Sequence, residues 1–394
     1  MNRKRNAVVL GAGCAIGLLM MGCSAGTDSQ CDSSGRACTW IGQPGRTAFN
    51  KDGHDRLATS LYWTMDTLFA HDGTTWFIDW NNHLVRKVGL DGKVTSVVGT
   101  TDPVFPGDGD MVDPKAEFTA DGAPGTAVQL NHPTDLYELA NGTILIMAWH
   151  NHKLRALDPS TGRVRVLAGA GAGFAGDGGP ATAALFKQPS RLALDEAQNI
   201  YILDQQNERI RRIDAATNII TTIAGSGAQG FAGDGGPALQ AKFNWEVGDN
   251  PEPSGGLVYR AGKLYIADTD NHRIRMMDLA SGVITTIAGT GDKGFAGDGG
   301  AATSAQLFRP HDLEFGPEGD LYIADTYNNV VRAINLTTGA IRTAVGTGTM
   351  GLDSTDDKMA TDTMLYRPFG IDFDPEGNLY VDDSLNSRVL RVAL

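Results

Sequence analysis

The segment Leu264-Tyr-Ile-Ala-Asp-Thr-Asp-Asn-His-Arg-Ile-Arg-Met-Met-Asp278 decides the fold, because the chain contains six versions of it. The other five begin at Thr75, Ile144, Ile200, Leu321 and Leu379. The same asparagine marks every version: Asn82, Asn151, Asn207, Asn271, Asn328 and Asn386. A unit that recurs in this way indicates a repeat architecture, in which each copy is one supersecondary structure packed on its neighbours.

Each repeat is interpreted as four short strands. In the fifth repeat the first strand follows Pro310, the second is the apolar run 321–324, and the third is 330–334. An unbroken apolar run predicts a strand that is buried on both faces, as between stacked blades. The fourth strand is of the type Ile284-Thr-Thr-Ile-Ala-Gly289. Six such units predict an all-β fold, a six-bladed β-propeller of four-stranded blades.

The fourth strand occurs only five times after the first repeat begins, and the sequence stops at Leu394, directly after the third strand of the sixth repeat. Cys38-Thr-Trp-Ile-Gly42 has the length and the terminal glycine of the missing strand. We therefore expect an N-terminal strand to complete the last blade, with the propeller domain covering residues 38–394. Closure of this kind removes the unpaired sheet edge at the seam.

The asparagine-histidine core of these segments, with an aspartate before it and an arginine after it, resembles the NHL repeat family. The resemblance extends from Cys38 to the end of the chain. It implies a six-bladed propeller, and it favours a function in protein contacts, because many members of the family act in that way. A shared fold does not by itself fix a function.

The N-terminus is interpreted as an export signal. A basic start (Arg3-Lys4-Arg5) precedes the apolar run Ala7–Met21, which ends in Gly22-Cys23. The ending resembles a bacterial lipobox, although Met20 stands where leucine is usual. This predicts a lipoprotein signal at 1–22, lipidation of Cys23 and a polar tether at 23–37. The alternative is an ordinary signal peptide cleaved near Ala25.

Ser24 after the lipidated cysteine resembles an outer-membrane address, so the expected location is a lipid anchor in the outer membrane, on the periplasmic or cell-surface face. Export into an oxidising compartment makes a disulfide between Cys31 and Cys38 the preferred interpretation over a metal site. Without residues 1–22 the chain has 30 basic and 46 acidic residues, a net charge of −16. Such a charge argues against nucleic acid and against electrostatic docking on anionic lipid. The membrane is therefore expected as a partner only through the lipid anchor.

The residues that enter the first strand of each blade are expected to form the mouth of the central channel. This position differs between blades, and variable repeat positions are where a ligand site is expected. The predicted ligand site consists of Asp66, Asp135, Arg191, His311, Asp312 and Phe369.

The residues at these positions can be compared with the metal ligands of two enzyme classes. Peptidylglycine-amidating lyases, which resemble these repeats, hold zinc with three histidines that follow the proline, whereas here only His311 does so and His132 is one step out of register. Lactonase-like propellers hold calcium, and Asp66, Asp135 and Asp312 offer a related set of oxygens. If the protein is an enzyme, the candidate catalytic residues are His311, Asp312, Asp135, Asp66 and Arg191.

The loop motif Gly-Phe-Ala-Gly-Asp-Gly-Gly, present three times from Gly173, Gly230 and Gly294, admits a phosphate-binding or a calcium-binding interpretation. A structural turn is preferred, because no Lys-Ser/Thr follows and each loop offers one carboxylate. A short helical turn is expected to start at Pro180 and at Pro237.

Residues that recur in most blades are expected to be structural, because a catalytic site needs a unique constellation. The recurring aspartates are Asp79, Asp204, Asp268, Asp325 and Asp383, with Ala148 as the exception. The recurring arginines are Arg86, Arg155, Arg211, Arg275 and Arg332, with Leu390 as the exception. The turn histidines His83, His152 and His272 are placed in the same class. Trp80 and Trp149 are interpreted as loop packing rather than as a stacking platform for a sugar or peptide.

The sequence therefore predicts a non-catalytic binding or scaffold propeller of the cell envelope that recognises a protein, peptide or glycan, without a cofactor. The alternative is a metal-dependent hydrolase or lyase with calcium or zinc at the channel mouth. A purely structural envelope component is the third class.

Overall fold

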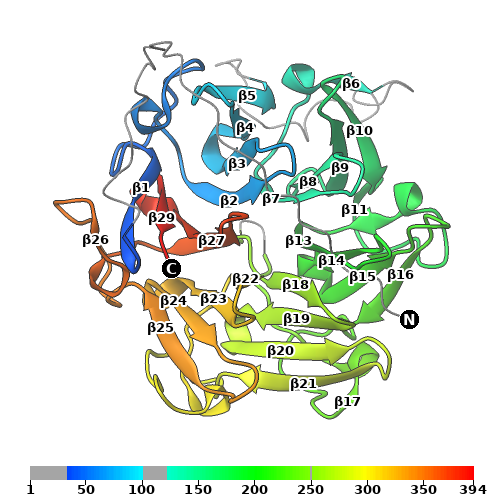
Figure 1. Ribbon diagram of the computed structural model, residues 1–394. Helices are drawn as coiled ribbons and strands as arrows, with labels where there is room; N and C mark the ends of the chain where they lie inside the picture. Colours follow the sequence, from blue (N-terminus) through cyan, green and yellow to red (C-terminus); the bar gives the residue numbers. More distant parts are fainter. Residues whose placement is uncertain (1–32, 101–121, 249–250) are drawn as a thin grey trace, which may run out of the picture.

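The computed structural model describes residues 33–100, 122–248 and 251–394, and six antiparallel sheets surround a central axis in it (Figure 1). Each sheet is one blade, and its first strand lies nearest the axis. The first five blades contain four main strands each. In chain order they are blade 1, with β2 (Thr64–Phe69), β3 (Thr75–Asp79), β4 (Leu84–Val88) and β5 (Val94–Val98); blade 2, with β7 (Pro133–Glu138), β8 (Ile144–Ala148), β9 (Lys153–Asp158) and β10 (Arg163–Ala168); and blade 3, with β13 (Pro189–Leu194), β14 (Ile200–Asp204), β15 (Arg209–Ile213) and β16 (Ile220–Ala224). They continue with blade 4, which has β18 (Gly256–Arg260), β19 (Lys263–Asp268), β20 (Arg273–Asp278) and β21 (Val283–Ala288), and blade 5, which has β22 (Asp312–Phe315), β23 (Leu321–Asp325), β24 (Val330–Ile334) and β25 (Ile341–Val345).

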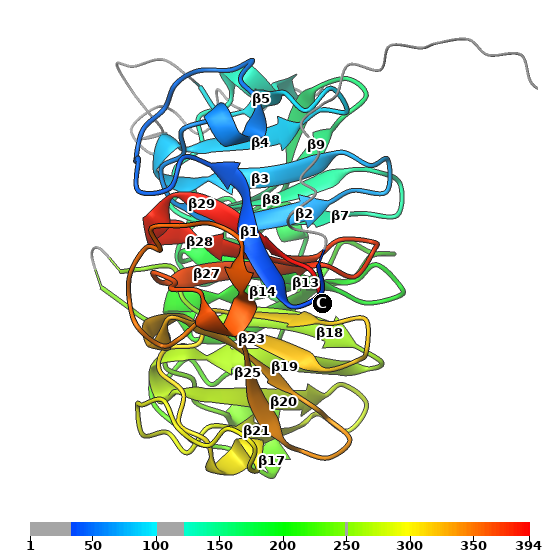
Figure 2. The same ribbon diagram turned by 60° about the vertical axis from the view of Figure 1, so that its left-hand side comes forward.

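The sixth blade confirms the predicted closure. It combines β27 (Pro368–Phe373), β28 (Leu379–Asp383) and β29 (Arg388–Val392) with β1 (Arg36–Gly42), which pairs antiparallel with β29. Figure 2 shows β1 running alongside the C-terminal strands. The strand begins at Arg36, two residues before the expected domain boundary, because Ala37 still pairs with Val392.

Short two-residue strands extend three of the blades or join neighbouring loops: β6 (Ala123–Pro124), β11 (Gly171–Ala172), β12 (Leu185–Phe186), β17 (Gly236–Pro237) and β26 (Lys358–Met359). The predicted helical turns are present as 3-10 turns, Ala181–Ala183 after Pro180 and Ala238–Gln240 after Pro237. No helix among the described residues is long and apolar enough to cross a membrane.

The second strands are buried on both faces, as the apolar runs predict: every residue of β3, β8, β14, β23 and β28 is buried. Stacking of neighbouring blades on both sides of these strands forms the core. For example, Ile266 and Ala267 pack in separate hydrophobic clusters on the two sides of blade 4.

A buried ion pair fixes the turn between the second and third strands in five of the six blades, whereas blade 2 has Ala148 at the aspartate position. In blade 4, Arg275 Nη1 lies 3.1 Å from Asp268 Oδ2, and neither side chain is exposed. Asp268 also accepts hydrogen bonds from the backbone amide of Asn244 and from Asn271 Nδ2, each at 2.9 Å. The equivalent pairs are Asp79–Arg86, Asp204–Arg211 and Asp325–Arg332. The structural interpretation of the recurring aspartates and arginines is confirmed in these blades.

In the sixth blade the arginine that pairs with the turn aspartate comes from a different position of the third strand. Arg388, at the start of β29, donates from Nε to Asp383 Oδ2 at 2.8 Å, and Leu390 packs in the core. The sequence comparison missed this substitution because the guanidinium arrives from two residues earlier on the strand.

The glycine-rich loops engage the same arginines from the other side. In blade 4, Arg275 Nη2 lies 2.6 Å from Asp234 Oδ1, and Thr286 Oγ1 donates to Asp234 Oδ2. Phe231 covers the guanidinium with its ring, 4.9 Å from the ring centroid to Arg275 Cζ. Asp177 and Asp298 pair likewise with Arg211 and Arg332. The loop carboxylates are thus engaged by guanidinium groups, which favours the structural-turn interpretation.

The turn histidines accept hydrogen bonds from the entry loop of the next blade. The backbone amide of His132 donates to His83 Nδ1 at 3.1 Å, and those of Gln188 and Arg309 donate to His152 and His272. In the fifth blade Asn329 takes the place of histidine and accepts from the amide of Arg367, in the entry loop of the sixth blade, at 3.0 Å. The expectation that these histidines are structural is confirmed.

Replacing Asp268 by alanine removes the fully buried one of the two carboxylates that pair with Arg275, and it leaves the amide of Asn244 and Asn271 Nδ2 without this acceptor. We expect a loss of about 3–5 kcal/mol in the free energy of unfolding, because breaking a buried pair on one side costs more than the pair contributes. Urea unfolding followed by tryptophan fluorescence measures it. The exposed Asp292→Ala change is the control and should cost below about 0.5 kcal/mol. Equal small losses for both variants would show that the pair does not hold the turn.

Candidate functional site

The structure brings the predicted mouth residues together and buries them. Asp66, Asp135, Arg191, His311, Asp312 and Phe369 are between 1% and 8% exposed. They lie where the first strands converge around the axis, at the ends where those strands begin. We call this side of the disc the entry face. The ring therefore lies beneath the entry face and is closed off from it.

Arg191 braces the channel from one side to the other. Its Nη1 donates to the carbonyl oxygen of Thr134 at 2.9 Å, and its Nη2 donates to that of Phe369 at 3.1 Å. Its Nε contacts the carbonyl oxygen of Gly255 at 3.4 Å, and Nη1 lies 3.4 Å from Asp135 Oδ1. One guanidinium thus ties blades 2, 4 and 6 to blade 3.

The three ring aspartates bond the next first strand along. Asp66 Oδ2 accepts from the amide of Leu136 at 2.7 Å, and Asp312 Oδ2 accepts from that of Ile371 at 2.9 Å. Asp135 Oδ2 accepts from the amide of Leu192. These amides face the channel on innermost edge strands and would otherwise lack a partner, a costly arrangement in a buried position. The aspartates therefore have a structural role in the ring.

Below this ring the channel holds a cavity of about 150 Å³ lined by residues of all six first strands. Two further carboxyl groups, Glu314 and Asp372, line it together with the ring aspartates, and the charge of Asp312 also acts on buried Asp382. Burial raises the pKa of Asp135 to about 7, and Arg191 opposes the rise. Burial also raises the pKa of Asp382 to about 7. The single arginine does not compensate all these carboxyl groups, so part of them is protonated at neutral pH.

Within the described ranges no group of three or more His, Cys, Asp or Glu side chains is arranged to hold a metal ion. His311 illustrates the reason. Its Nδ1 contacts the carbonyl oxygen of Arg309 at 2.8 Å, and its ring packs against Phe369 and Tyr327. Its Nε2 is buried without a hydrogen-bond partner. Burial lowers the pKa of His311 well below its ordinary value, so the imidazole is neutral.

A second ring, which the sequence pattern did not reveal, lies two to three residues before the predicted one. Its members have a left-handed backbone with φ between 50° and 62°, although none is glycine: Trp63, His132, Gln188, Arg309 and Arg367. Such a conformation costs roughly 1–3 kcal/mol and is often found at ligand sites. The detectable signal was chemical variation at one repeat position, which changes from Trp to His, Gln and Arg around the disc.

Blades 1 and 2 carry an aromatic cluster on the entry face. We define the aromatic cluster by its members: Tyr62, Trp63, Trp80, His132, Trp149 and His150. Trp63 stacks on Trp80 with a centroid distance of 5.6 Å, and Trp149 stacks on His150 at 4.0 Å. Trp80 and Trp149 are buried, as the loop-packing interpretation predicts. Tyr62 is 39% exposed and Trp63 is partly buried, so these two offer the accessible ring surface.

Blades 4 to 6 carry a charged cluster on the same face. Tyr327 lies between the guanidinium groups of Arg309 and Arg367, 4.7 and 4.2 Å from its ring centroid. Arg309 pairs with Glu246 and Asp270, and Arg367 Nη1 donates to Glu252 Oε1 at 3.0 Å. The two cations are thus already neutralised by carboxylates of the chain itself.

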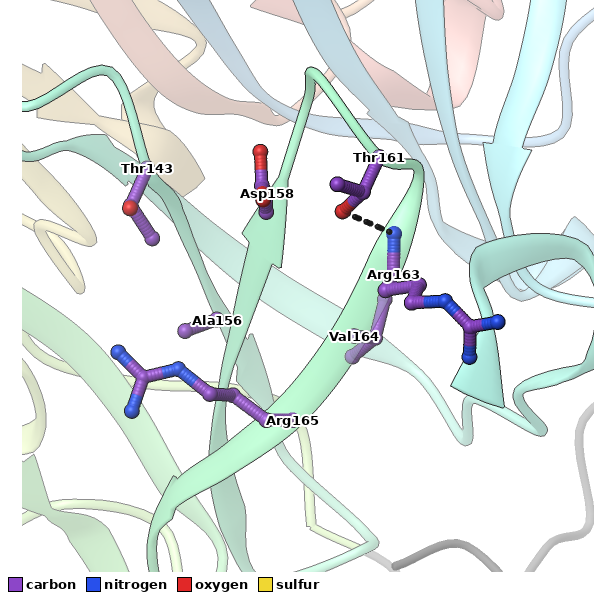
Figure 3. A pocket seen from close by; sticks show the side chains of 7 residues that line it. All are labelled: Thr143, Ala156, Asp158, Thr161, Arg163, Val164 and Arg165. Carbon is purple, nitrogen blue, oxygen red and sulfur yellow. Dashed lines mark hydrogen bonds between the residues drawn. The ribbon is translucent and has the colours of Figure 1, made fainter. Parts of the chain in front are cut away.

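A further cleft of about 450 Å³ lies at the outer side of blade 2, between β9 and β10 (Figure 3). Arg163 and Arg165 line it, but Figure 3 shows them pointing away from each other. Arg163 Nη1 already donates to the carbonyl oxygen of Gly122 at 2.7 Å. The two cations therefore do not converge on one anion.

The predicted disulfide and the predicted lipidation involve cysteines at or beyond the start of the described residues. Cys38, in β1, is disulfide-bonded. Its expected partner Cys31, and the expected lipidation site Cys23, lie outside the described residues, so this pairing and the lipid anchor stay predictions.

The geometry defines a closed propeller of NHL-type repeats, and comparisons with known proteins agree. No family model matches the chain. The chain is 28% identical over 273 residues to the Arabidopsis thaliana protein SUPPRESSOR OF QUENCHING 1, chloroplastic, and 26% identical over 288 residues to Homo sapiens NHL repeat-containing protein 2. Each match covers 66% of this chain, but only 24% and 37% of those relatives. The chain is thus an NHL repeat-containing six-bladed β-propeller with distant relatives among NHL repeat proteins.

Solved structures share the fold at low sequence identity. A protein of unknown function from Bacteroides thetaiotaomicron has a TM-score of 0.63 and 16% identity, over 91% of this chain and 75% of that one. An auxiliary nutrient binding protein from Bacteroides ovatus has a TM-score of 0.60 and 15% identity, over 90% and 76%. A gluconolactonase from Xanthomonas campestris has a TM-score of 0.50 and 11% identity, over 90% and 97%. At these identities the likeness shows the fold alone.

The raised pKa values of the channel carboxyl groups predict that the free energy of unfolding falls as the pH rises through neutrality. Because the pKa of Asp382 is raised to about 7, folding favours its protonated form, and that contribution is lost as the pH rises through about 7. Buried histidines act in the opposite direction, since the pKa is lowered to about 2 for His132 and about 4 for His152, but only below about pH 6.5.

The free energy of unfolding should therefore decrease between about pH 6.5 and 8.5. The isosteric Asp382→Asn variant should show a shallower decrease, while exposed Asp292→Asn should follow the unmodified protein. Chemical unfolding at several pH values measures both slopes. If the Asp382→Asn variant loses stability with pH as steeply as the unmodified protein, Asp382 does not contribute to the decrease.

Proposed function

We propose that the protein is a non-catalytic recognition propeller that binds a glycan, peptide or protein of the cell envelope through its entry face. The observation that carries the proposal is the Arg191 brace. It closes the channel beneath the entry face, and the ring residues that would perform chemistry are bonded to neighbouring blades. Contacts with a ligand are thereby left to the loops above the ring.

The aromatic cluster supports this assignment of the contact surface. Aromatic rings supply contact area at little entropic cost, and tryptophan and tyrosine are frequent binding hot spots. Trp63 is held by Trp80 beneath it and by Tyr62 beside it, in an edge-on contact at 6.2 Å. Its ring is thus oriented before any ligand arrives. A small or oligomeric ligand is also compatible with the likeness in fold to the auxiliary nutrient binding protein of Bacteroides ovatus.

The alternative, a metal-dependent hydrolase or lyase at the channel, is less well supported. Asp66, Asp135 and Asp312 each use one oxygen on a backbone amide. A calcium ion needs six to eight oxygen ligands, so these bonds would have to be exchanged together.

The contact surface predicts a specific loss on removal of one ring. We expect the purified protein to bind members of an array of bacterial envelope polysaccharides, peptidoglycan fragments and peptides. Trp63→Ala should weaken binding about tenfold, equivalent to about 1.4 kcal/mol, because it removes the accessible ring face. Leu90→Ala is the control: Leu90 is 86% exposed in the same blade, but it lies in the turn between β4 and β5 at the opposite face. Binding unaffected by Trp63→Ala, or hydrolysis of a lactone that Asp312→Asn abolishes, would contradict the proposal.

The envelope location is proposed from the N-terminal sequence. Arg3-Lys4-Arg5, the apolar run and Gly22-Cys23 support a lipid anchor, with residues 23–37 as a tether, and Ser24 supports the outer membrane.

Expression of the full chain in a Gram-negative host tests the anchor. Cys23→Ser should abolish incorporation of labelled palmitate and shift the protein from the membrane fraction to the soluble fraction. Cys14→Ser, inside the apolar run, is the matched control and should retain the label. A mature N-terminus directly after Ala25 would show an ordinary signal peptide in its place.

A further inference from the structure

Two histidines of the aromatic cluster turn their Nδ1 atoms toward one another. His132 Nδ1 and His150 Nδ1 are 3.2 Å apart, and their rings are nearly perpendicular. Asn131 Oδ1 lies 2.7 Å from the first nitrogen and 3.3 Å from the second. Three donor atoms therefore converge on one point between blade 2's entry loop and its turn after β8.

We propose that His132, His150 and Asn131 form a binding site for a divalent transition-metal ion such as Zn²⁺. Two imidazole nitrogens bound to one zinc at about 2.0–2.1 Å, at the tetrahedral angle, lie about 3.3–3.4 Å apart, close to the separation in this structure. Imidazole nitrogen is a preferred ligand of zinc and copper. The amide oxygen supplies a third contact, and solvent completes the shell.

The surroundings hold the ligands in place. Trp80 packs on His132 with centroids 4.3 Å apart, and Trp149 stacks on His150 at 4.0 Å. The backbone amide of His132 is bonded to His83 Nδ1, and that of Asn131 to Asn151 Oδ1 at 2.8 Å. Both ligand-bearing loops are thus fixed by contacts that do not use the proposed ligand atoms. Such supporting contacts set the orientation of metal ligands in proteins.

The protonation state also suits a metal. Burial, with His83 and His150 nearby, lowers the pKa of His132 to about 2, so its ring is neutral, as metal binding requires. Without a metal, His132 Nδ1 donates to Asn131 Oδ1 at 2.7 Å. With a metal, each ring carries its proton on Nε2, so no net proton is released.

The site goes beyond the proposed function and does not depend on it. It contains two histidines and an amide, so it differs from the clusters of three acidic, histidine or cysteine groups that the described residues lack. It also differs from the channel ring, because none of its three residues belongs to that ring.

Titration of the untagged protein with Zn²⁺ alone, followed by calorimetry, tests the site. We expect one ion per chain, with binding at least tenfold weaker in His150→Ala, whose imidazole can be removed without loss of the backbone contacts. His71→Ala is the matched control, because His71 is exposed and pairs with Glu138 at 2.7 Å, an alternative surface site. Loss of binding in His71→Ala, or equal binding in His150→Ala, would overturn the proposal.

Cu²⁺ provides a readout that needs no variant. Bound at this point it should quench part of the tryptophan fluorescence, because Trp80 and Trp149 contact the ligand rings. Its electron paramagnetic resonance spectrum should show coupling to two imidazole nitrogens. A spectrum with one or no coupled imidazole, or undiminished fluorescence at saturating Cu²⁺, would also overturn the proposal. Ligand binding by the entry face is measured separately, so its failure and the failure of the metal site are distinguishable.

Discussion

The buried aspartate–arginine pair found in five of the six blades is the constraint on which the rest of the structure depends. Removal of two charges from water is costly unless their remaining hydrogen-bonding groups are satisfied. Asp268 and Arg275 meet this requirement through Asn271, a backbone amide and the carboxylate of Asp234. These partners come from three separate loops of the repeat. The pair therefore dictates the shape of the blade's entry-face turn, and any other arrangement of those loops leaves a buried charge.

The same turns connect the blades. Because the turn places its last residue in a left-handed conformation, His83 or His272 can accept from the entry loop of the next blade. Closure by β1 adds the last blade to this circle. At the axis Arg191 adds a second set of bonds between blades. The positions between these two sets are free to differ in chemistry, and they lie on the entry face of the disc.

The fold was predictable because its determinants lie within one repeat. The six asparagines fix the period, the apolar runs identify the second strands, and β24 has the bounds that its sequence pattern predicts. The composition of the ring was also predictable from register, since two adjacent positions at the start of each first strand supply it. The burial of the ring could not be predicted, because it depends on the hydrogen bond of Arg191 to the carbonyl oxygen of Phe369 across the channel. The sequence likewise does not reveal that Arg388 replaces an arginine absent at Leu390.

The two halves of the entry face differ in what a ligand must displace. In the charged cluster, Arg309 and Arg367 are already paired with carboxylates of the chain, so an anionic ligand would have to exchange those bonds for equivalent ones and gain little. In the aromatic cluster, the pKa of His132 keeps its ring neutral, and Trp63 offers an apolar face, so a ligand covers it without removing a charge from water. Affinity should therefore come mainly from the neutral half, and the charged half should act by excluding ligands that leave its pairs unsatisfied.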